Sequence, residues 1–354
     1  ALFGCYSFVN HVLANHPDTP ARIDAPTVLE AVRARFEAVG TQVVHAAGCA
    51  VADPDTAAIA DAVTCAEAAD VVLAVLGDQA GLFGRGTSGE GCDTVQLSLP
   101  GVQTELVEAL LATGKPVVLV LVTGRPYAIG PLVERAAATL QVFFPGQAGG
   151  AALAGVLAGD VSPSGRLAVS IPPGVGVEPY SYLRSRLAEK STVSAIDPTP
   201  RFAFGHGLSY TTFEYSRPLF GPPAAPTDGW LEAAATVTNT GRRAGAEVVQ
   251  LYARDLVASV TRPVAQLVGF RRVELAPGAA ATVSFRVPTA RLAFHDRQMR
   301  RVVEPGAVEL WFGRSSAAPA TAAQVVELVG ELNTVSDTSP RLTEVAVALA
   351  PAGG

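Results

Sequence analysis

Two periodicities of hydrophobic and polar residues divide the chain, and the change falls after residue 171. In the first part, continuous apolar runs at 71–76, 116–122 and 139–144 alternate with stretches of helical periodicity. Such runs are typical of parallel strands buried on both faces of a sheet. The pattern predicts an α/β fold, with a mostly parallel sheet and helices on both faces.

The remaining elements of this first part follow from the same pattern. Helices are expected at 28–36, 57–69, 102–113, 132–138 and from about 150 to 158, and further strands at 41–48 and 167–171. No strong strand precedes the first of these helices, although a doubly wound sheet normally begins with one. We therefore expect the natural chain to start well before Ala1.

After Trp230 the apolar positions alternate with a period of two. Alternating stretches at 231–237, 247–252, 266–270, 282–287 and 308–312 are separated by Asn, Pro and Gly turns. This spacing predicts an all-β sandwich of the immunoglobulin or fibronectin type III class. The expected domains are an α/β domain at 1–171, a proline-bearing linker and connector at 172–229, the sandwich at 230–316, and a tail at 317–354 that can add one edge strand, at 324–328.

The composition argues against several kinds of partner and site. The 354 residues are 49% hydrophobic and 16% charged, with a net charge of −6, which argues against nucleic acid or an anionic membrane surface as a partner. No uninterrupted apolar stretch predicts a membrane-spanning helix. Four widely spaced cysteines favour reduced thiols over disulfides. No cluster has metal-ligand spacing, so neither a metal nor a cofactor is expected.

The unusual feature of the chain is the connection between the apolar run at 71–76 and the helix expected from 102. A strand-to-helix turn needs two to six residues, whereas this one is far longer and rich in glycine. A long loop at the carboxyl end of a sheet strand is usually functional, because ligands bind there in open α/β sheets. Within it Glu90 lies between two glycines and is the first candidate for chemistry.

The same loop matches the dinucleotide fingerprint G-x-G-x-x-G at 84–89. That fingerprint works when its first glycine ends the strand and its last one opens the helix. Here the strand is expected to end near Gly77 and the helix to begin near Pro100, so nucleotide binding is the weaker interpretation.

The motifs together resemble those of the C-terminal half of family-three glycoside hydrolases, the β-glucosidase and β-xylosidase family. They occur in family order over most of the chain, at 88–93 (SGEGCD), 97–103 (LSLPGVQ), 115–118 (KPVV), 123–126 (TGRP), 144–150 (FPGQAGG), 159–167 (GDVSPSGRL), 204–210 (FGHGLSY) and 304–306 (EPG). Any one motif is weak, but the set is specific. The resemblance implies an α/β-sandwich domain followed by a fibronectin-like domain.

The resemblance also implies residue roles. Glu90 corresponds to the acid/base, and the family's aspartate nucleophile lies in a barrel domain that nothing in this sequence resembles. The sequence departs from the family at Thr94, where arginine is common. Among the neighbours, Asp93 is expected to order the loop, and Arg85 either holds a sugar hydroxyl or pairs with a carboxylate. Asp78 and Arg166 are expected to be structural.

We therefore expect the C-terminal part of a retaining, exo-acting β-glycosidase. Its substrate would be an oligosaccharide or glycoside with a terminal β-linked glucose or xylose, and its partner the N-terminal barrel of the same protein. Retaining hydrolysis needs two carboxylates, so this chain alone is expected to be inactive. The alternative is a non-catalytic carbohydrate-binding or scaffolding module that kept the fold.

Overall fold

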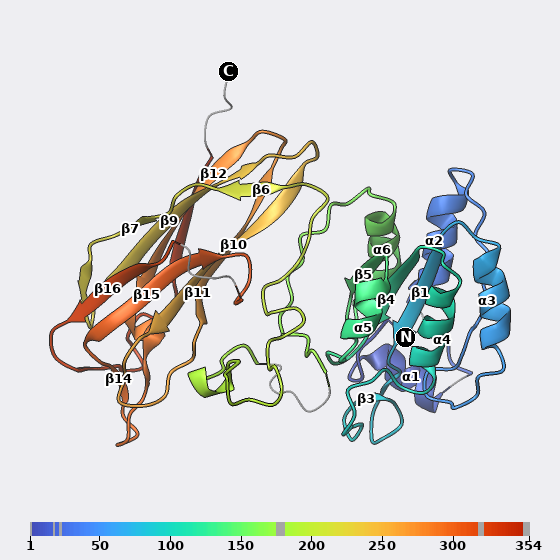
Figure 1. The fold of residues 1–354 in the computed structure, drawn as a ribbon, viewed down its shortest axis with the longest axis horizontal. Coiled ribbons are helices and arrows are strands. Elements are labelled where there is room, and N and C mark those ends of the chain that lie inside the picture. Colours follow the sequence, from blue (N-terminus) through green and yellow to red (C-terminus); the bar gives the residue numbers. More distant parts are fainter. Residues whose placement is uncertain (1, 17, 21–22, 175–180, 318–321, 350–354) are drawn as a thin grey trace. The chain divides into compact units, whose positions relative to one another are not determined.

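The computed structural model describes residues 2–16, 18–20, 23–174, 181–317 and 322–349, and the chain forms two compact units (Figure 1). The first unit comprises Ala1–Val161 and Ile171–Val177, and the second comprises Ser162–Ser170 and Glu178–Gly354. The segment 162–170 therefore belongs to the second unit, although the sequence pattern placed it in the α/β domain.

The first unit is built on a parallel sheet with helices on both faces, which confirms the predicted α/β fold. Its three strands run in the order β1 (Val72–Gly77), β4 (Val117–Val122), β5 (Ala138–Gln141). Side chains of β4 alternate between two cores. One core includes α3 (Ile59–Glu67), α4 (Gln103–Ala112) and α5 (Gly130–Arg135), and the other includes α2 (Val28–Glu37) and α6 (Gly149–Leu157).

Two predicted strands of this unit are wrong. Residues 41–50 are extended but pair with no strand in the described part of the chain, and residues 167–170 form no strand there. Val43 and Ala46 pack on opposite cores, which explains the apolar pattern of 41–48, but a strand also needs a hydrogen-bonded neighbour. Strand β1 pairs only with β4 among the described residues, and Val75 on β1 is exposed.

The second unit is a sandwich of two mainly antiparallel sheets, as predicted. One sheet has the order β11-β10-β15-β16-β8, and the other the order β18-β12-β9-β6 with β7 also paired to β9. The long strands are β9 (Trp230–Asn239), β10 (Gly245–Asp255), β11 (Gln266–Leu275), β12 (Ala280–Pro288) and β15 (Gly306–Gly313). Their inward positions, such as Val237, Leu251 and Val283, form one continuous core.

The sandwich includes strands from both sides of the 230–316 range. From the expected connector come β6 (Phe213–Tyr215), β7 (Leu219–Phe220) and β8 (Ala224–Pro226), with Phe213 and Ala225 in the core. From the expected tail come β16 (Gln324–Val329) and β18 (Glu344–Leu349). Strand β16 lies between β15 and β8, so it is not an edge strand. A small sheet of β13 (Phe294–His295), β14 (Arg301–Val303) and β17 (Asn333–Thr334) completes the unit.

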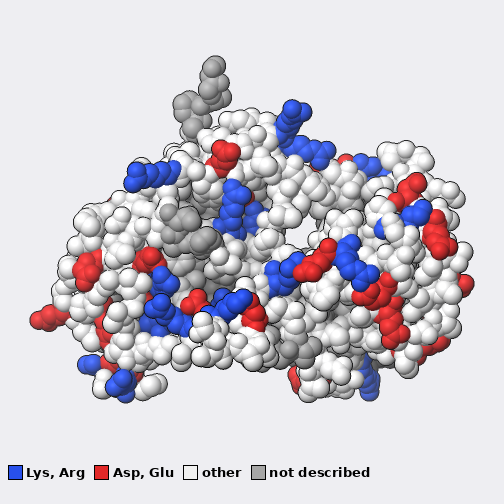
Figure 2. Space-filling model, viewed as in Figure 1, with Lys and Arg blue, Asp and Glu red and all other residues white. Residues whose placement is uncertain are grey.

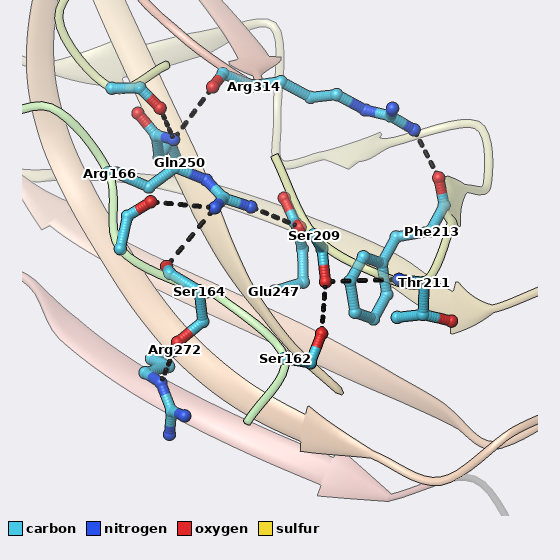
Figure 3. A network of polar contacts seen from close by, with 12 residues as sticks. Ser162, Ser164, Arg166, Ser209, Thr211, Phe213, Glu247, Gln250, Arg272 and Arg314 are labelled. Carbon is cyan, nitrogen blue, oxygen red and sulfur yellow. Dashed lines mark hydrogen bonds and ion pairs between the residues drawn. The ribbon is translucent and has the colours of Figure 1, made fainter. Parts of the chain in front are cut away.

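A buried polar network fixes the segment 162–170 in the second unit (Figure 3). Arg166 Nη2 lies 2.8 Å from Glu247 Oε2, and their side chains are only 10% and 4% exposed. The Tyr215 hydroxyl donates a hydrogen bond of 2.9 Å to the other oxygen of Glu247. Burial and then the nearby Glu247 raise the pKa of Tyr215. The Ser162 and Ser209 hydroxyls are 2.9 Å apart in the same network.

Candidate active site

The long connection after β1 begins with a buried carboxylate. Asp78 is 4% exposed and accepts three hydrogen bonds, from Thr87 Oγ1 at 2.7 Å, the Tyr127 hydroxyl at 2.5 Å and the Gly124 backbone N–H at 2.8 Å. Burial, together with the contact to Asp78, raises the pKa of the Tyr127 phenol. Because Gly124 follows β4, Asp78 ties together the loops that leave two adjacent strands.

Glycines in this loop allow close contact between backbones. The short strands β2 (Ala80–Gly81) and β3 (Ser88–Gly89) pair in parallel. Gly89 has φ of 133°, and a Cβ added there would lie 2.0 Å from the carbonyl oxygen of Gly81. Only glycine fits such a position, so the glycine-rich composition folds the loop back on itself beside the end of the sheet.

The folded loop presents Glu90 at the surface. The backbone of Gly84 donates to the Glu90 carbonyl at 3.2 Å, and Cys92 donates to the Gly89 carbonyl at 3.1 Å. The carboxylate accepts a hydrogen bond of 2.7 Å from the Tyr6 hydroxyl on Oε2. This contact raises the pKa of Tyr6. Tyr6 comes from the segment before α1 (Phe8–Asn15), far from Glu90 in sequence.

A hollow of about 510 Å³ lies beside Glu90 at the carboxyl end of the sheet. It is lined by Gly89, Tyr6 and Arg125, among others, and thus by both the neighbour and the hydrogen-bonding partner of Glu90. Arg125 Nη2 donates to the Cys92 carbonyl at 2.7 Å, which holds the guanidinium against the loop that carries Glu90. The lining thus contains a phenol and a guanidinium, and the Glu90 carboxylate lies next to it through its hydrogen bond to Tyr6.

None of the predicted site residues, Glu90 included, is part of the lining of this hollow. Arg85 and Asp93 are both exposed on the same loop, and neither is a lining residue. Among the described residues the Asp93 carboxylate accepts no hydrogen bond, whereas Asp78 accepts three. The sequence pattern indicated neither Tyr6 nor Arg125 as part of the site, because nothing local to these residues reports their distance from Glu90.

The dinucleotide fingerprint does not have the geometry that nucleotide binding requires. Gly84 and Gly89 lie inside the folded loop, while α4 begins only at Gln103. The Gln103 side chain accepts from the Gly77 N–H at 2.7 Å and donates to the Gly77 carbonyl at 2.8 Å. The first turn of α4 therefore packs against the end of β1 through this side chain, and the glycine-rich segment is elsewhere.

All four cysteines are free thiols, as predicted. Over the described residues, His, Cys, Asp and Glu side chains form no group of three that could hold a metal ion. No helix in the described part of the chain is long and apolar enough to cross a membrane. Figure 2 shows acidic and basic side chains interspersed on the face drawn.

Comparison of this chain with known protein families and proteins identifies the same family that its motifs resemble. Residues 2–210 match the model of the glycosyl hydrolase family 3 C-terminal domain, and residues 247–316 match a fibronectin type III-like domain. A periplasmic β-glucosidase of Salmonella typhimurium is 42% identical over 74% of this chain and 35% of its own length. A β-xylosidase of Formosa agariphila is 40% identical over 77% of this chain and 38% of its own length.

Solved structures of β-glucosidases are also similar to this chain. A β-glucosidase from Erythrobacter marinus matches with a TM-score of 0.79 and 35% identity, over 88% of this chain and 44% of that protein. A β-glucosidase from Listeria innocua in complex with isofagomine matches with a TM-score of 0.77 and 29% identity, over 87% and 42%. The chain thus spans less than half the length of these relatives.

Proposed function

The chain belongs to glycoside hydrolase family 3, and from this premise we propose that it is the part of a retaining, exo-acting β-glycosidase that carries the acid/base, Glu90. The proposed substrate is an oligosaccharide or glycoside with a terminal β-linked glucose or xylose. The relatives named β-glucosidase and β-xylosidase support this class and do not choose between the two sugars.

One observation carries the proposal. Glu90 is an exposed carboxylate on a loop that Asp78 anchors to the carboxyl ends of β1 and β4, and its hydrogen-bonding partner Tyr6 lines the adjoining hollow. The Tyr6 hydroxyl donates to Oε2 and so holds the carboxylate, and we assign Oε1 to proton transfer to the scissile oxygen of a bound glycoside. In this scheme Arg125 binds a sugar hydroxyl. Arg85 keeps its proposed role in substrate binding, whereas the loop-ordering role of Asp93 has no hydrogen bond or ion pair to support it among the described residues.

The nucleophile of the proposed reaction comes from outside this chain. Retaining hydrolysis uses two carboxyl groups about 5–5.5 Å apart, one to protonate the leaving oxygen and one to attack the sugar. Asp78 is the other carboxylate near the loop's base, but it is buried and saturated by three donors, so it cannot attack. We assign this role to an aspartate in an N-terminal barrel of the complete protein.

The proposed acid must carry a proton at working pH, whereas an ordinary glutamic acid has a pKa near 4.3. Burial by a bound sugar and a negative charge on the nucleophile each raise the pKa of a carboxyl group. When the glycosyl-enzyme forms, the charge of the nucleophile is consumed, so Glu90 can ionise and then act as the base toward water.

The test is Glu90→Ala in the complete, barrel-containing protein. Hydrolysis of an unactivated disaccharide should fall about 10²–10⁴-fold, because proton transfer to the leaving group is lost. A dinitrophenyl glycoside needs little acid assistance, so the glycosyl-enzyme should still form and accumulate. Added azide needs no base and should restore turnover, giving a β-glycosyl azide. Parent-like activity on the disaccharide would show that Glu90 transfers no proton.

A second prediction concerns this chain by itself. Lacking a nucleophile, the 354-residue chain should release no aryl alcohol from aryl β-glucosides or β-xylosides above the buffer rate. Turnover at the rates of an ordinary enzyme would contradict the need for a carboxylate from outside the chain. The alternative, a non-catalytic carbohydrate-binding or scaffolding module, predicts no loss on Glu90→Ala in the complete protein, and a nucleotide-binding protein would be retained on a nucleotide resin.

A further inference from the structure

The turn at residues 4–7 is held by the helix that follows it. The Ser7 N–H closes the turn by donating to the Gly4 carbonyl at 3.0 Å. Asn10 lies in the first turn of α1, and its side-chain amide donates to the carbonyls of Phe3 at 2.7 Å and Gly4 at 2.9 Å. A side-chain amide has two N–H donors, so both are used on the backbone at this turn.

The same segment is attached to two loops at the carboxyl end of the sheet. The Leu2 carbonyl accepts a hydrogen bond of 2.8 Å from the Gly146 N–H, in the loop after β5. Cys5 packs against the loop after β1, where a Cβ added at Gly89 would lie 2.7 Å from the Cβ of Cys5. Because Gly89 immediately precedes Glu90, the turn is fixed against the backbone of the proposed acid/base.

Tyr6 depends on this turn for its position. It is 76% exposed, so packing restricts the rotamers of its side chain little. An exposed side chain that is free to rotate loses conformational entropy when one contact holds it. A fixed backbone beneath the ring limits the positions that the hydroxyl can reach, and this hydroxyl donates to Glu90 Oε2 at 2.7 Å. The turn therefore favours the hydrogen bond between Tyr6 and Glu90.

We propose that Asn10 is a positioning residue for the acid/base and acts through Tyr6. Asn10 fixes the turn, the turn places the Tyr6 hydroxyl, and the hydroxyl holds the Glu90 carboxylate. Asn10 does not line the hollow beside Glu90, so it has no direct part in binding there. Proton transfer depends on such placement, because a displacement of about 1 Å can cost on the order of 10²-fold in rate. The inference rests on the proposed role of Glu90 and adds that α1 sets the orientation of this carboxylate.

The first test uses this chain and needs no catalysis. The contact with Glu90 raises the pKa of Tyr6, so releasing the turn should let the phenol ionise at lower pH. Asn10→Leu keeps the approximate shape of the side chain without an N–H, and Asn10→Ala removes the side chain beyond Cβ. In both variants the ¹³Cζ titration of Tyr6 should shift in the direction that Glu90→Ala gives, and a thermal melt shows whether each variant is folded. An unchanged titration in the folded variants would overturn the proposal.

The second test uses the complete, barrel-containing protein and compares kcat/KM for two substrates. An unactivated disaccharide needs a well-placed acid, whereas a dinitrophenyl glycoside needs little acid assistance. Asn10→Leu should lower kcat/KM for the disaccharide about 10-fold and change that for the dinitrophenyl glycoside by less than about twofold. Thr27→Ala removes the side-chain cap of α2 in the same unit, so it is the matched control and should leave the ratio of the two values unchanged. Equal losses on both substrates in Asn10→Leu would indicate general damage and contradict a positioning role.

A double variant separates action through Tyr6 from an independent effect of Asn10. Tyr6→Phe alone should reproduce the loss on the disaccharide. Tyr6→Phe/Asn10→Leu should then be no slower than Tyr6→Phe, because the contact that Asn10 supports is already absent. Losses that multiply would contradict the proposed route. Parent-like activity of Glu90→Ala on the disaccharide would overturn the acid/base and this inference together, whereas a strong loss in Glu90→Ala with none in Asn10→Leu would overturn the positioning role alone.

Discussion

At the scale of single residues, two neighbouring carboxylates of one loop differ in environment and therefore in role. Asp78 is buried and receives three donors, so it organises the loop, whereas Glu90 is exposed and receives one donor, from Tyr6. All of the contacts of Asp78 are within the loop and its neighbours, whereas Glu90 keeps one carboxylate oxygen without a hydrogen-bonding partner among the described residues. The sequence indicated Glu90 through its flanking glycines, but Tyr6 lies 84 positions away and only the fold reveals that pairing.

The pairing predicts a change in the titration of Tyr6. The Glu90 carboxylate accepts a hydrogen bond from the Tyr6 phenol and raises the pKa of Tyr6, so Glu90→Ala should lower that pKa toward the ordinary value of about 10. The phenolate should therefore form at lower pH. The measurement is an NMR titration of ¹³Cζ-labelled tyrosine, with the Tyr6 signal assigned from Tyr6→Phe. Asp93→Ala removes a carboxylate from the same loop and should leave Tyr6 unchanged; equal shifts in both variants would contradict a specific contact.

At the scale of elements, the sequence pattern predicted the helices and strands whose burial depends on residues close together in the chain. The apolar runs of β1 and β4 and the helical periodicity of α2 and α4 were enough to predict these elements, because the spacing of apolar residues reports whether an element is buried on one face or on two. Strand pairing is non-local, and this is where the sequence pattern failed. The apolar stretch at 41–48 is extended but has no hydrogen-bonded neighbour among the described strands, whereas β8 contains Pro226 and still pairs with β16 at the edge of its sheet.

The loop after β1 gives a prediction about backbone geometry. In Gly89→Ala the new Cβ would lie 2.0 Å from the Gly81 carbonyl oxygen and 2.7 Å from Cys5 Cβ, so β2 and β3 should separate. We expect a loss of about 2–4 kcal/mol in the free energy of unfolding, measured by urea denaturation.

Gly114→Ala is the matched control for that variant. Gly114 also has a positive φ, of 73°, but an added Cβ would meet nothing within 4 Å. Its cost should be confined to the left-handed backbone, about 1 kcal/mol. If both variants lose the same stability, the close approach of Gly89 to Gly81 contributes nothing beyond its backbone angle.

At the scale of the whole molecule, the Arg166–Glu247 ion pair joins the segment 162–170 to the second unit. Arg166 was expected to be a packing residue, and the structure places it in the second unit, on Glu247. Arg166→Met leaves a buried carboxylate with the Tyr215 hydroxyl alone, and breaking such a pair costs about 3–5 kcal/mol. The double variant Arg166→Met/Glu247→Met should be less destabilised than the sum of the two single variants, as measured by denaturant unfolding.

The control for this double-mutant comparison is an exposed ion pair in the same unit, Lys190–Asp197. Lys190→Met should change the unfolding midpoint very little, because solvent screens both charges. Additive effects of the two substitutions at Arg166 and Glu247 would show that the two side chains are not energetically coupled.

The placement of residues 162–170 also has a consequence in time. The chain enters the second unit at Ser162, leaves it at Ile171 and re-enters it later. Glu247 follows Arg166 by 81 positions, so at a synthesis rate of about 5–20 residues per second the arginine emerges about 4–16 s before its partner exists. During that interval an apolar anchor would invite aggregation. The anchoring side chains Ser162, Ser164 and Arg166 are instead ones that water solvates well, so this part of the segment can stay hydrated on the growing chain until the sandwich forms around it.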